Sequence, residues 1–317
     1  AKAAAMVASL VVLAGCEFDE GPPPRAADEP SAIAAQLQAS SEEAAQLYRV
    51  VETYFNEYLA LNPIFATELG DHRFDDRFGD YASASWMADS LGIEQESLER
   101  LLAIDASRLR GEDRITYEAF KFQRELAIYG FRYPSELLAL DQFSNWSNVF
   151  VQLASGQGAH PFRTAADYDR FLARMDGFVA WTEQAINNLR AGVSKGVVLP
   201  TVVVERTLPQ LEPFAKIEDP RQTLFWRPLL NFPAGLTVAD RKRLLAAYEE
   251  KLRTQVVPAY RRLHDYLARE YLPNARETVD DREELASALA LTDEGGAGRD
   301  VDLARDRGDR AQVALRA

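Results

Sequence analysis

Apolar residues recur at steps of three and four positions over much of the chain, which is the spacing of one face of an α-helix. The clearest case runs from Ser41 to Leu61, where the apolar positions are Leu47, Val50, Val51, Tyr54, Phe55, Tyr58 and Leu59. This spacing predicts an amphipathic helix that begins near Ser40 or Ser41 and ends at Asn62-Pro63, because proline disfavours helical geometry in the residue before it. Similar spacing predicts further helices over residues 84–109 and 112–129.

Two later helices share a capping pattern at their start. Thr164 and Thr237 are each followed three residues later by Asp, and an apolar helical face follows in both segments. Such a threonine accepts a hydrogen bond from a backbone N–H in the first turn of the helix. Gly192 follows the first face, so we expect that helix to end there, since glycine is common just past a helix C-terminus. In the second helix Pro258 lacks a backbone donor, and we expect it to bend or break the helix.

A single run, from Val197 to Val204, has a β-like composition. Pro200 interrupts it, and proline is unfavourable within a strand but well tolerated in the first turn of a helix. We therefore expect a short loop followed by a helix that reaches about Leu211. The fold class predicted for the chain is all-α, a multi-helix domain with at most a minor hairpin.

The first sixteen residues are predicted to be a lipoprotein signal peptide. Lys2 precedes a short apolar run over Ala3–Ala14, and the small residues Gly15 and Cys16 follow it. The run is too short to span a bilayer, and Leu13-Ala14-Gly15-Cys16 matches the site that lipoprotein signal peptidase cleaves. Cys16, the only cysteine, is therefore the expected lipidation site and the expected link to the membrane. The alternative is a signal peptide in which the cysteine occurs by chance.

After the signal peptide we expect a tether, a helical domain and a tail, located in the cell envelope and facing the periplasm. Residues 17–40 contain several prolines and few large apolar groups, which predicts a disordered tether. Residues 41–279 form the predicted helical domain. Residues 280–317 lack aromatic side chains and are rich in Arg, Asp and Gly, which predicts a disordered tail or a reading frame lost after Thr278. Whether the anchor lies in the inner or the outer membrane is left open.

Charge and motifs exclude several functions. A net charge of −13 argues against nucleic-acid binding, which requires concentrated Lys and Arg. The three histidines lie far apart and form no H-E-x-x-H pair, so no metal ligand and no cofactor are predicted in this chain. The acidic loop from Asp71 to Asp80 lacks the ligand order and central glycine of a calcium loop. Its interleaved Arg73 and Arg77 indicate a loop that neutralises its own charge.

Two polar loops between predicted helices are candidate walls of a substrate cleft. One contains Asp141 and Gln142, and the other contains His160 and Arg163. Binding residues often lie on loops that a rigid scaffold holds in place. The alternative is that His160-Pro161 and Thr164 only position the helix that follows them.

Several short stretches together resemble the bacterial domain-of-unknown-function family eight-eight-five, whose full-length members resemble gluzincin-type zinc peptidases. The resemblance rests on the order and spacing, over roughly residues 42–279, of Asn62-Pro63 through Gly70, Asp141-Gln142, His160-Pro161-Phe162, Asp167-Tyr168, Gly192 with Gly196 and Pro200, and Tyr271-Leu272-Pro273 with Arg276-Glu277-Thr278. It implies the N-terminal half of a larger zinc-peptidase-like helical fold. Family members are about twice this length, and their zinc segment lies in the half that this sequence does not contain. The resemblance therefore assigns no zinc ligand and no catalytic glutamate to any residue here.

Two functions remain open from the sequence. In the first, the chain is the truncated and inactive N-terminal half of a zinc-metallopeptidase-like envelope lipoprotein, and only a complete protein would bind zinc and a peptide substrate. In the second, it is a non-enzymatic, lipid-anchored scaffold or binding protein of the cell envelope. The family-like order of motifs and the composition of the tail favour the first.

Overall fold

The computed structural model describes residues 41–143 and 145–277, and every regular element within them is helical. This confirms the predicted all-α class. No hairpin occurs in these residues, whose isolated extended pairing is a parallel bridge between Pro200 and Arg276. The predicted signal peptide with Cys16, the tether over residues 17–40 and the tail over residues 280–317 lie outside the described residues.

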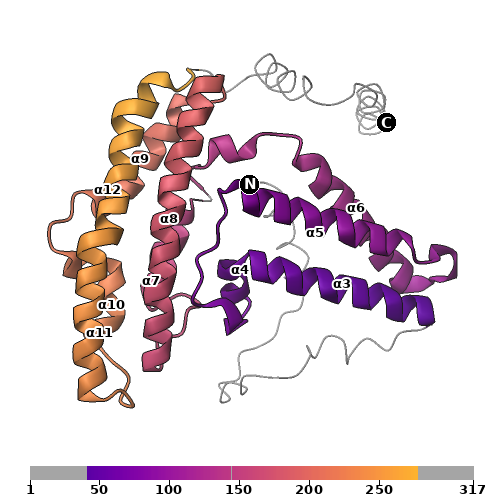
Figure 1. Ribbon diagram of the computed structural model, residues 1–317, viewed down its shortest axis with the longest axis horizontal. Coiled ribbons are helices and arrows are strands. Elements are labelled where there is room, and N and C mark those ends of the chain that lie inside the picture. The colour runs from indigo at the N-terminus through magenta and orange to yellow at the C-terminus, as the bar shows by residue number, and fades with distance from the viewer. Residues whose placement is uncertain (1–40, 144, 278–317) are drawn as a thin grey trace, which may run out of the picture.

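Three helices form the first part of the fold, the three-helix unit: α3 (Glu42–Leu61), α5 (Ala84–Leu102) and α6 (Gly111–Gly130) (Figure 1). As predicted, α3 begins after Ser41, whose Oγ accepts a hydrogen bond from the Ala44 N–H at 3.1 Å. The facing sides of the three helices and their connections enclose an apolar core of Ala44, Leu47, Tyr54, Leu101, Ile104, Leu109, Tyr117 and Phe120.

The second predicted helix is shorter than expected. The helix α5 ends at Leu102 and not at Leu109, because Asp105 caps a separate 3₁₀ turn over Ala106–Arg108 by accepting a hydrogen bond from the Ser107 N–H at 3.0 Å. The turn redirects the chain, and Leu109 is still buried in the core with an exposed fraction of 2%. Apolar spacing alone therefore did not distinguish one continuous helix from a helix followed by a turn.

The long helix α8 (Ala165–Lys195) is the centre of the second part of the fold, the α8 unit (Figure 1). Three helices pack against it, namely α7 (Trp146–Ala154), α11 (Val238–Lys251) and α12 (Val257–Tyr266), while α9 (Thr201–Ala215) packs on α12. The buried face of α8 carries Tyr168, Phe171, Met175, Phe178, Trp181, Ala185 and Leu189. The connections contain the short helices α4 (Pro63–Glu68) and α10 (Arg227–Leu230) and the 3₁₀ turns His72–Phe74, Ser135–Leu138, Pro220–Gln222, Leu224–Trp226 and Leu272–Asn274.

The end of α8 corrects the prediction for Gly192. The helix continues to Lys195 and is capped by Gly196, whose φ of +72° is the left-handed conformation that favours glycine. Gly192 lies inside the helix, where a Cβ would be only 2.5 Å from the carbonyl oxygen of Val197 and 3.0 Å from that of Leu137. The glycine at this position is therefore explained by close backbone approach and not by helix termination.

The helical path also continues through Pro258, which we expected to bend or break it. Between α11 and α12 the chain forms a wider, π-helical turn over Leu252–Val256, and a second π-helical turn, Leu267–Tyr271, follows α12. A proline ring conflicts with the carbonyl four residues earlier in a regular α-helix. The wider turn just before Pro258 changes that spacing, so the proline is accommodated without interrupting the helix.

Candidate functional site

Four buried polar side chains fasten the segment between α3 and α5 to α8, and we call them the Asp75 cluster: Thr67, Asp75, His160 and Arg174. Thr67 lies in α4, and Asp75 follows the turn His72–Phe74. His160 lies in the loop between α7 and α8, and Arg174 lies in α8 itself. None of the four is more than 2% exposed, although all are polar.

Arg174 supplies most of the hydrogen bonds of the Asp75 cluster. Its Nη2 donates to Thr67 Oγ1 at 2.8 Å and to the carbonyl oxygen of Phe74 at 3.0 Å. Its Nε donates to the carbonyl oxygen of Arg77 at 2.8 Å. The same Nη2 lies 3.4 Å from Asp75 Oδ1, in an ion pair whose two side chains are both 0% exposed. A planar guanidinium suits this role because its fixed donors reach several acceptors at once.

Asp75 completes the arrangement from the other side. Its Oδ1 accepts a hydrogen bond from Thr67 Oγ1 at 2.6 Å, and its Oδ2 lies 2.9 Å from Nδ1 of His72. The side chain of His72 is 46% exposed, so this edge of the Asp75 cluster reaches solvent. The buried carboxylate therefore has a charged partner and hydrogen-bonding partners, as a buried charge requires.

His160 is neutral in the folded protein. Its Nδ1 lies 3.4 Å from Nη1 of Arg174, and its Nε2 lies 3.0 Å from the carbonyl oxygen of Asp167. Because a guanidinium can only donate, Nδ1 is the acceptor, and the proton on Nε2 is donated to Asp167. Burial and, after it, the positive charge of Arg174 lower the pKa of His160 to about 4. Asp75 Oδ2 is 3.8 Å from Nδ1, which is too long for a hydrogen bond.

A carboxylate, an imidazole and a guanidinium are groups that enzymes use for acid–base catalysis and charge stabilisation. In the Asp75 cluster they bind one another and the backbone, and the side chains of Asp75, His160 and Arg174 are 0% exposed. Across residues 41–143 and 145–277 no group of three or more His, Cys, Asp or Glu is placed to hold a metal ion. In this structure the Asp75 cluster is a structural tie between the two parts of the fold.

The four candidate cleft residues fall in two separate places. Asp141 and Gln142 precede α7, and the Gln142 carbonyl accepts a hydrogen bond from Gln210 Nε2 of α9 at 3.1 Å. His160 and Arg163 follow α7, whose nine residues put about 13 Å of helix between the two loops. His160 is buried in the Asp75 cluster and Arg163 is exposed. That either loop contacts a substrate stays a prediction.

The segment from His160 to Asp167 holds the start of α8 in place. Thr164 Oγ1 accepts from the Asp167 N–H at 3.3 Å, and Asp167 Oδ2 accepts from the N–H groups of Thr164 at 2.8 Å and Arg163 at 3.1 Å. His160 also donates a hydrogen bond to the Asp167 carbonyl. The first turn of α8 is therefore fixed by hydrogen bonds to its backbone and to the side chains of Thr164 and Asp167.

Sequence reasoning missed Asp75 and Arg174. The expectation of a loop that neutralises its own charge fits Asp71, which pairs with Arg73 at 2.6 Å, but Asp75 turns inward. A signal for Arg174 was present, because it lies three residues after the buried Phe171 on the apolar face of the predicted helix. A charged residue at such a position needs a buried partner. Nothing in the pattern indicated which carboxylate that partner would be.

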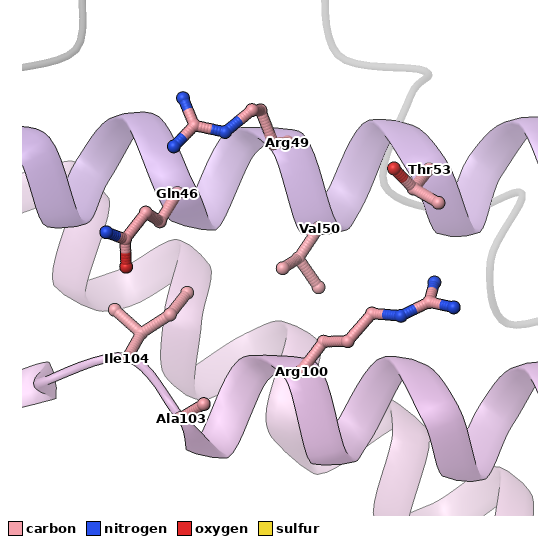
Figure 2. Close-up of a pocket in the computed structure, with 7 residues that line it drawn as sticks. All are labelled: Gln46, Arg49, Val50, Thr53, Arg100, Ala103 and Ile104. Carbon is pink, nitrogen blue, oxygen red and sulfur yellow. The ribbon is translucent and has the colours of Figure 1, made fainter.

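Two shallow grooves are open to solvent, and neither contains a candidate cleft residue. One, of about 400 Å³, lies between α3 and the end of α5 and is lined by Gln46, Arg49, Val50, Thr53, Arg100, Ala103 and Ile104. Figure 2 shows Gln46, Val50 and Ile104 directed into the space between the helices and Arg49 directed away from it. The other, of about 350 Å³, lies between the start of α5, the connection after α6, and α8. These surfaces do not by themselves define a catalytic site.

The fold and these features define an all-helical domain in which a buried ion pair and its hydrogen bonds fasten the segment between α3 and α5 to α8. Within the ranges that the structure describes, no helix is both long and apolar enough to cross a membrane. The chain belongs to the family described as bacterial protein of unknown function (DUF885), whose model matches residues 63–308. The matched region thus extends beyond the predicted helical domain into residues 280–308.

A solved structure, described as that of the putative lipoprotein from Colwellia psychrerythraea, is similar to the chain in fold. The TM-score is 0.54 and the sequence identity is 15%, and the match covers 74% of this chain and 42% of that chain. The chain therefore spans less than half the length of this structural relative. No curated protein matches the chain.

Proposed function

We propose that this chain is the N-terminal, non-catalytic helical part of a zinc-metallopeptidase-like lipoprotein, anchored in the cell envelope through lipid on Cys16 and facing the periplasm. The observation that carries the proposal is the part-length fold match: 74% of this chain corresponds to 42% of a larger chain described as a putative lipoprotein. The family match over residues 63–308 supports the membership of the chain in a family of unknown function. The reaction class in the proposal rests on the resemblance of full-length members to zinc peptidases.

In this proposal the helical part forms one wall of a substrate cleft. The remaining part of a full-length family member would supply zinc, the general base and the stabilisation of the transition state. A wall that positions substrate must be rigid, because small displacements of a bound substrate lower reaction rates strongly. The Asp75 cluster supports such a role, since it locks the loop after α4 onto α8 through buried bonds from one arginine.

The test is metal content and peptide hydrolysis of the full chain, purified in mild detergent, with and without a chelator. We expect much less than one zinc per chain and no chelator-sensitive cleavage, while a full-length relative assayed in parallel binds zinc and cleaves peptides. Circular dichroism and a cooperative melting transition verify that the chain is folded in the assay. Stoichiometric zinc together with chelator-sensitive cleavage by this chain alone would overturn the proposal.

The second candidate is a non-enzymatic, lipid-anchored scaffold or binding protein. The closed Asp75 cluster favours it, because the described part has buried apolar cores and a buried ion pair between Arg174 and Asp75 of its own. A chain that stays free of aggregates in detergent-free buffer would support this candidate. Detergent-free aggregation would instead support the first candidate, since part of a larger domain exposes apolar surface that another part would cover.

A further inference from the structure

The outer face of α6 carries an apolar stripe that no described element covers. Its members, the α6 stripe, are Ile115, Ala119, Phe122, Leu126 and Tyr129. Ile115 is 61% exposed and Phe122 is 63% exposed, with Leu126 at 43% and Tyr129 at 41%. The opposite face of the same helix is buried in the three-helix unit through Tyr117, Phe120 and Arg124. The helix is therefore apolar on two sides, although only one of them packs within the described fold.

The spacing of the α6 stripe is that of a helix that pairs with another helix. Its members follow one another at steps of four, three, four and three residues, which is the heptad repeat of a coiled coil. From Ile115 to Tyr129 it extends about 21 Å along the helix. Because α6 is already folded and held by α5 and α3, pairing through this face needs no new helix nucleation.

We propose that the α6 stripe is a self-association surface on which α6 of a second copy of this chain packs in the antiparallel direction. Antiparallel pairing brings Ala119 opposite Phe122 and Ile115 opposite Leu126. The small Ala119 then meets the large Phe122 in two places, and the branched Ile115 meets the branched Leu126 in two places. Large and small residues at facing positions pack without voids. Parallel pairing would place Phe122 opposite Phe122 of the second copy and Ala119 opposite its Ala119. The two phenylalanines would then be crowded, and the two alanines would leave a void.

The charges beside the α6 stripe suit pairing of identical chains. Along one flank lie Arg114, Glu118, Lys121 and Glu125, alternating in sign, with pairs from Arg114 to Glu118 at 2.5 Å and from Lys121 to Glu125 at 3.7 Å. This flank has no net charge, whereas the chain as a whole carries −13. In the antiparallel arrangement the same flank of each copy lies side by side, and Arg114 is offset from Glu125 of the second copy, and Glu118 from its Lys121 and Glu125, by about 3 Å along the helix axis. Two copies can therefore approach here without the repulsion expected over the rest of the acidic surface.

The contact is small. One pair of helices lies at the low end of specific interface areas, below about 1,200 Å² in total. We therefore expect a reversible dimer whose population rises with protein concentration. The inference goes beyond the proposed function, because it concerns a surface outside the Asp75 cluster and its readouts are mass and cross-linking, not zinc or hydrolysis.

The first test is the mass of the full chain in mild detergent, measured by sedimentation over a hundredfold range of concentration. We expect a shift from monomer to dimer for the natural sequence and for Leu230→Glu, a matched control because Leu230 is 66% exposed and lies in α10. Phe122→Glu should abolish the shift while the circular dichroism spectrum stays unchanged. A monomer at every concentration, or a dimer that Phe122→Glu does not weaken, would overturn the proposal.

Two further variants test the direction of pairing and the role of charge. In a Cys16→Ser background, Ile115→Cys with Leu126→Cys should form intermolecular disulfides on mild oxidation, while Ile115→Cys alone should not. Efficient cross-linking of the single variant would indicate parallel pairing and refute the arrangement.

A charge exchange gives an independent readout. Arg114→Glu with Lys121→Glu makes the flank fully acidic, and Glu118→Lys with Glu125→Lys makes it fully basic. Each should dimerise less than the natural chain when alone, and mixing the two should restore dimers that contain one copy of each. Absence of mixed dimers would contradict the assigned flank.

Discussion

Replacing Arg174 with methionine is the most direct perturbation of the Asp75 cluster. Methionine keeps a flexible chain of similar reach but removes the positive charge and every donor. The carbonyl oxygens of Phe74 and Arg77 would lose bonds of 3.0 and 2.8 Å, and Asp75 would remain as a buried carboxylate without its arginine. Removing one partner of a buried ion pair typically costs about 3–5 kcal/mol, because the other charge stays uncompensated.

We therefore expect Arg174→Met to lower the free energy of unfolding by about 4 kcal/mol. For a chain of this size that corresponds to a decrease in melting temperature of roughly 10 °C. The assay is urea unfolding followed by tryptophan fluorescence, which reports on the same core through the buried Trp181. Arg190→Met is the matched control on the same helix, because Arg190 is 56% exposed and pairs with an exposed Glu270. It should cost less than about 1 kcal/mol.

A second substitution separates the lost charge pair from lost packing. Adding Asp75→Asn to Arg174→Met removes the uncompensated carboxylate, so the double variant should be more stable than the sum of the single effects by at least about 1 kcal/mol. If Arg174→Met lowers the free energy of unfolding no more than Arg190→Met does, the Asp75 cluster does not stabilise the fold as described. If the changes in unfolding free energy of Arg174→Met and Asp75→Asn simply add, the ion pair does not contribute, and the hydrogen bonds from Arg174 to the backbone account for its effect.

Three further predictions concern α8 and the loop before it. Gly192→Ala should lower stability by about 1–3 kcal/mol in urea unfolding, because its Cβ would meet the Val197 carbonyl, whereas Gly92→Ala, which meets nothing within 4 Å, should not lower it. Thr164→Ala should cost about 1 kcal/mol by thermal melting, since it removes the cap of α8; no loss would mean that the cap is dispensable. The pKa of His160 is about 4 in the folded chain and 6.5 in the unfolded chain. The neutral His160 therefore contributes fully to the free energy of unfolding above pH 6.5, and about 3 kcal/mol of that free energy is lost as the pH falls from 6.5 towards 4. His160→Gln should flatten this part of the pH dependence of the urea midpoint, and an unchanged slope would contradict the assignment.

Local signals in the sequence predicted most of the helices correctly. Ser41 and Thr164 cap the helices that they were expected to cap, and α9 begins directly after Pro200. Caps, prolines and a 3.6-residue period act within one or two turns, so they can be recognised in the sequence alone. Predictions that depended on longer range were less accurate, as at Gly192, where the contact that requires glycine comes from Val197 and Leu137.

The local sequence pattern does not predict which residues pair in the buried ion pairs. Arg174 lies 99 residues from Asp75, and Arg124 of α6 is buried against Glu94 of α5 at 2.9 Å. In both cases an arginine occupies the buried face of a predicted helix, which signals that a partner is needed. The identity of the partner depends on how the intervening turns fold, and the sequence pattern does not contain that information.

The sequence by itself determined the helical class, the starts of the main helices and the resemblance to a family, because each depends on residues that are close in the chain. Tertiary structure decided which faces are covered. The apolar residues of α6 lie on both sides of that helix, and only the packing of α3 and α5 shows that the side with Phe120 is buried and the side with Phe122 is exposed. Burial is a property of two surfaces that meet, so a periodic pattern in one of them cannot specify it.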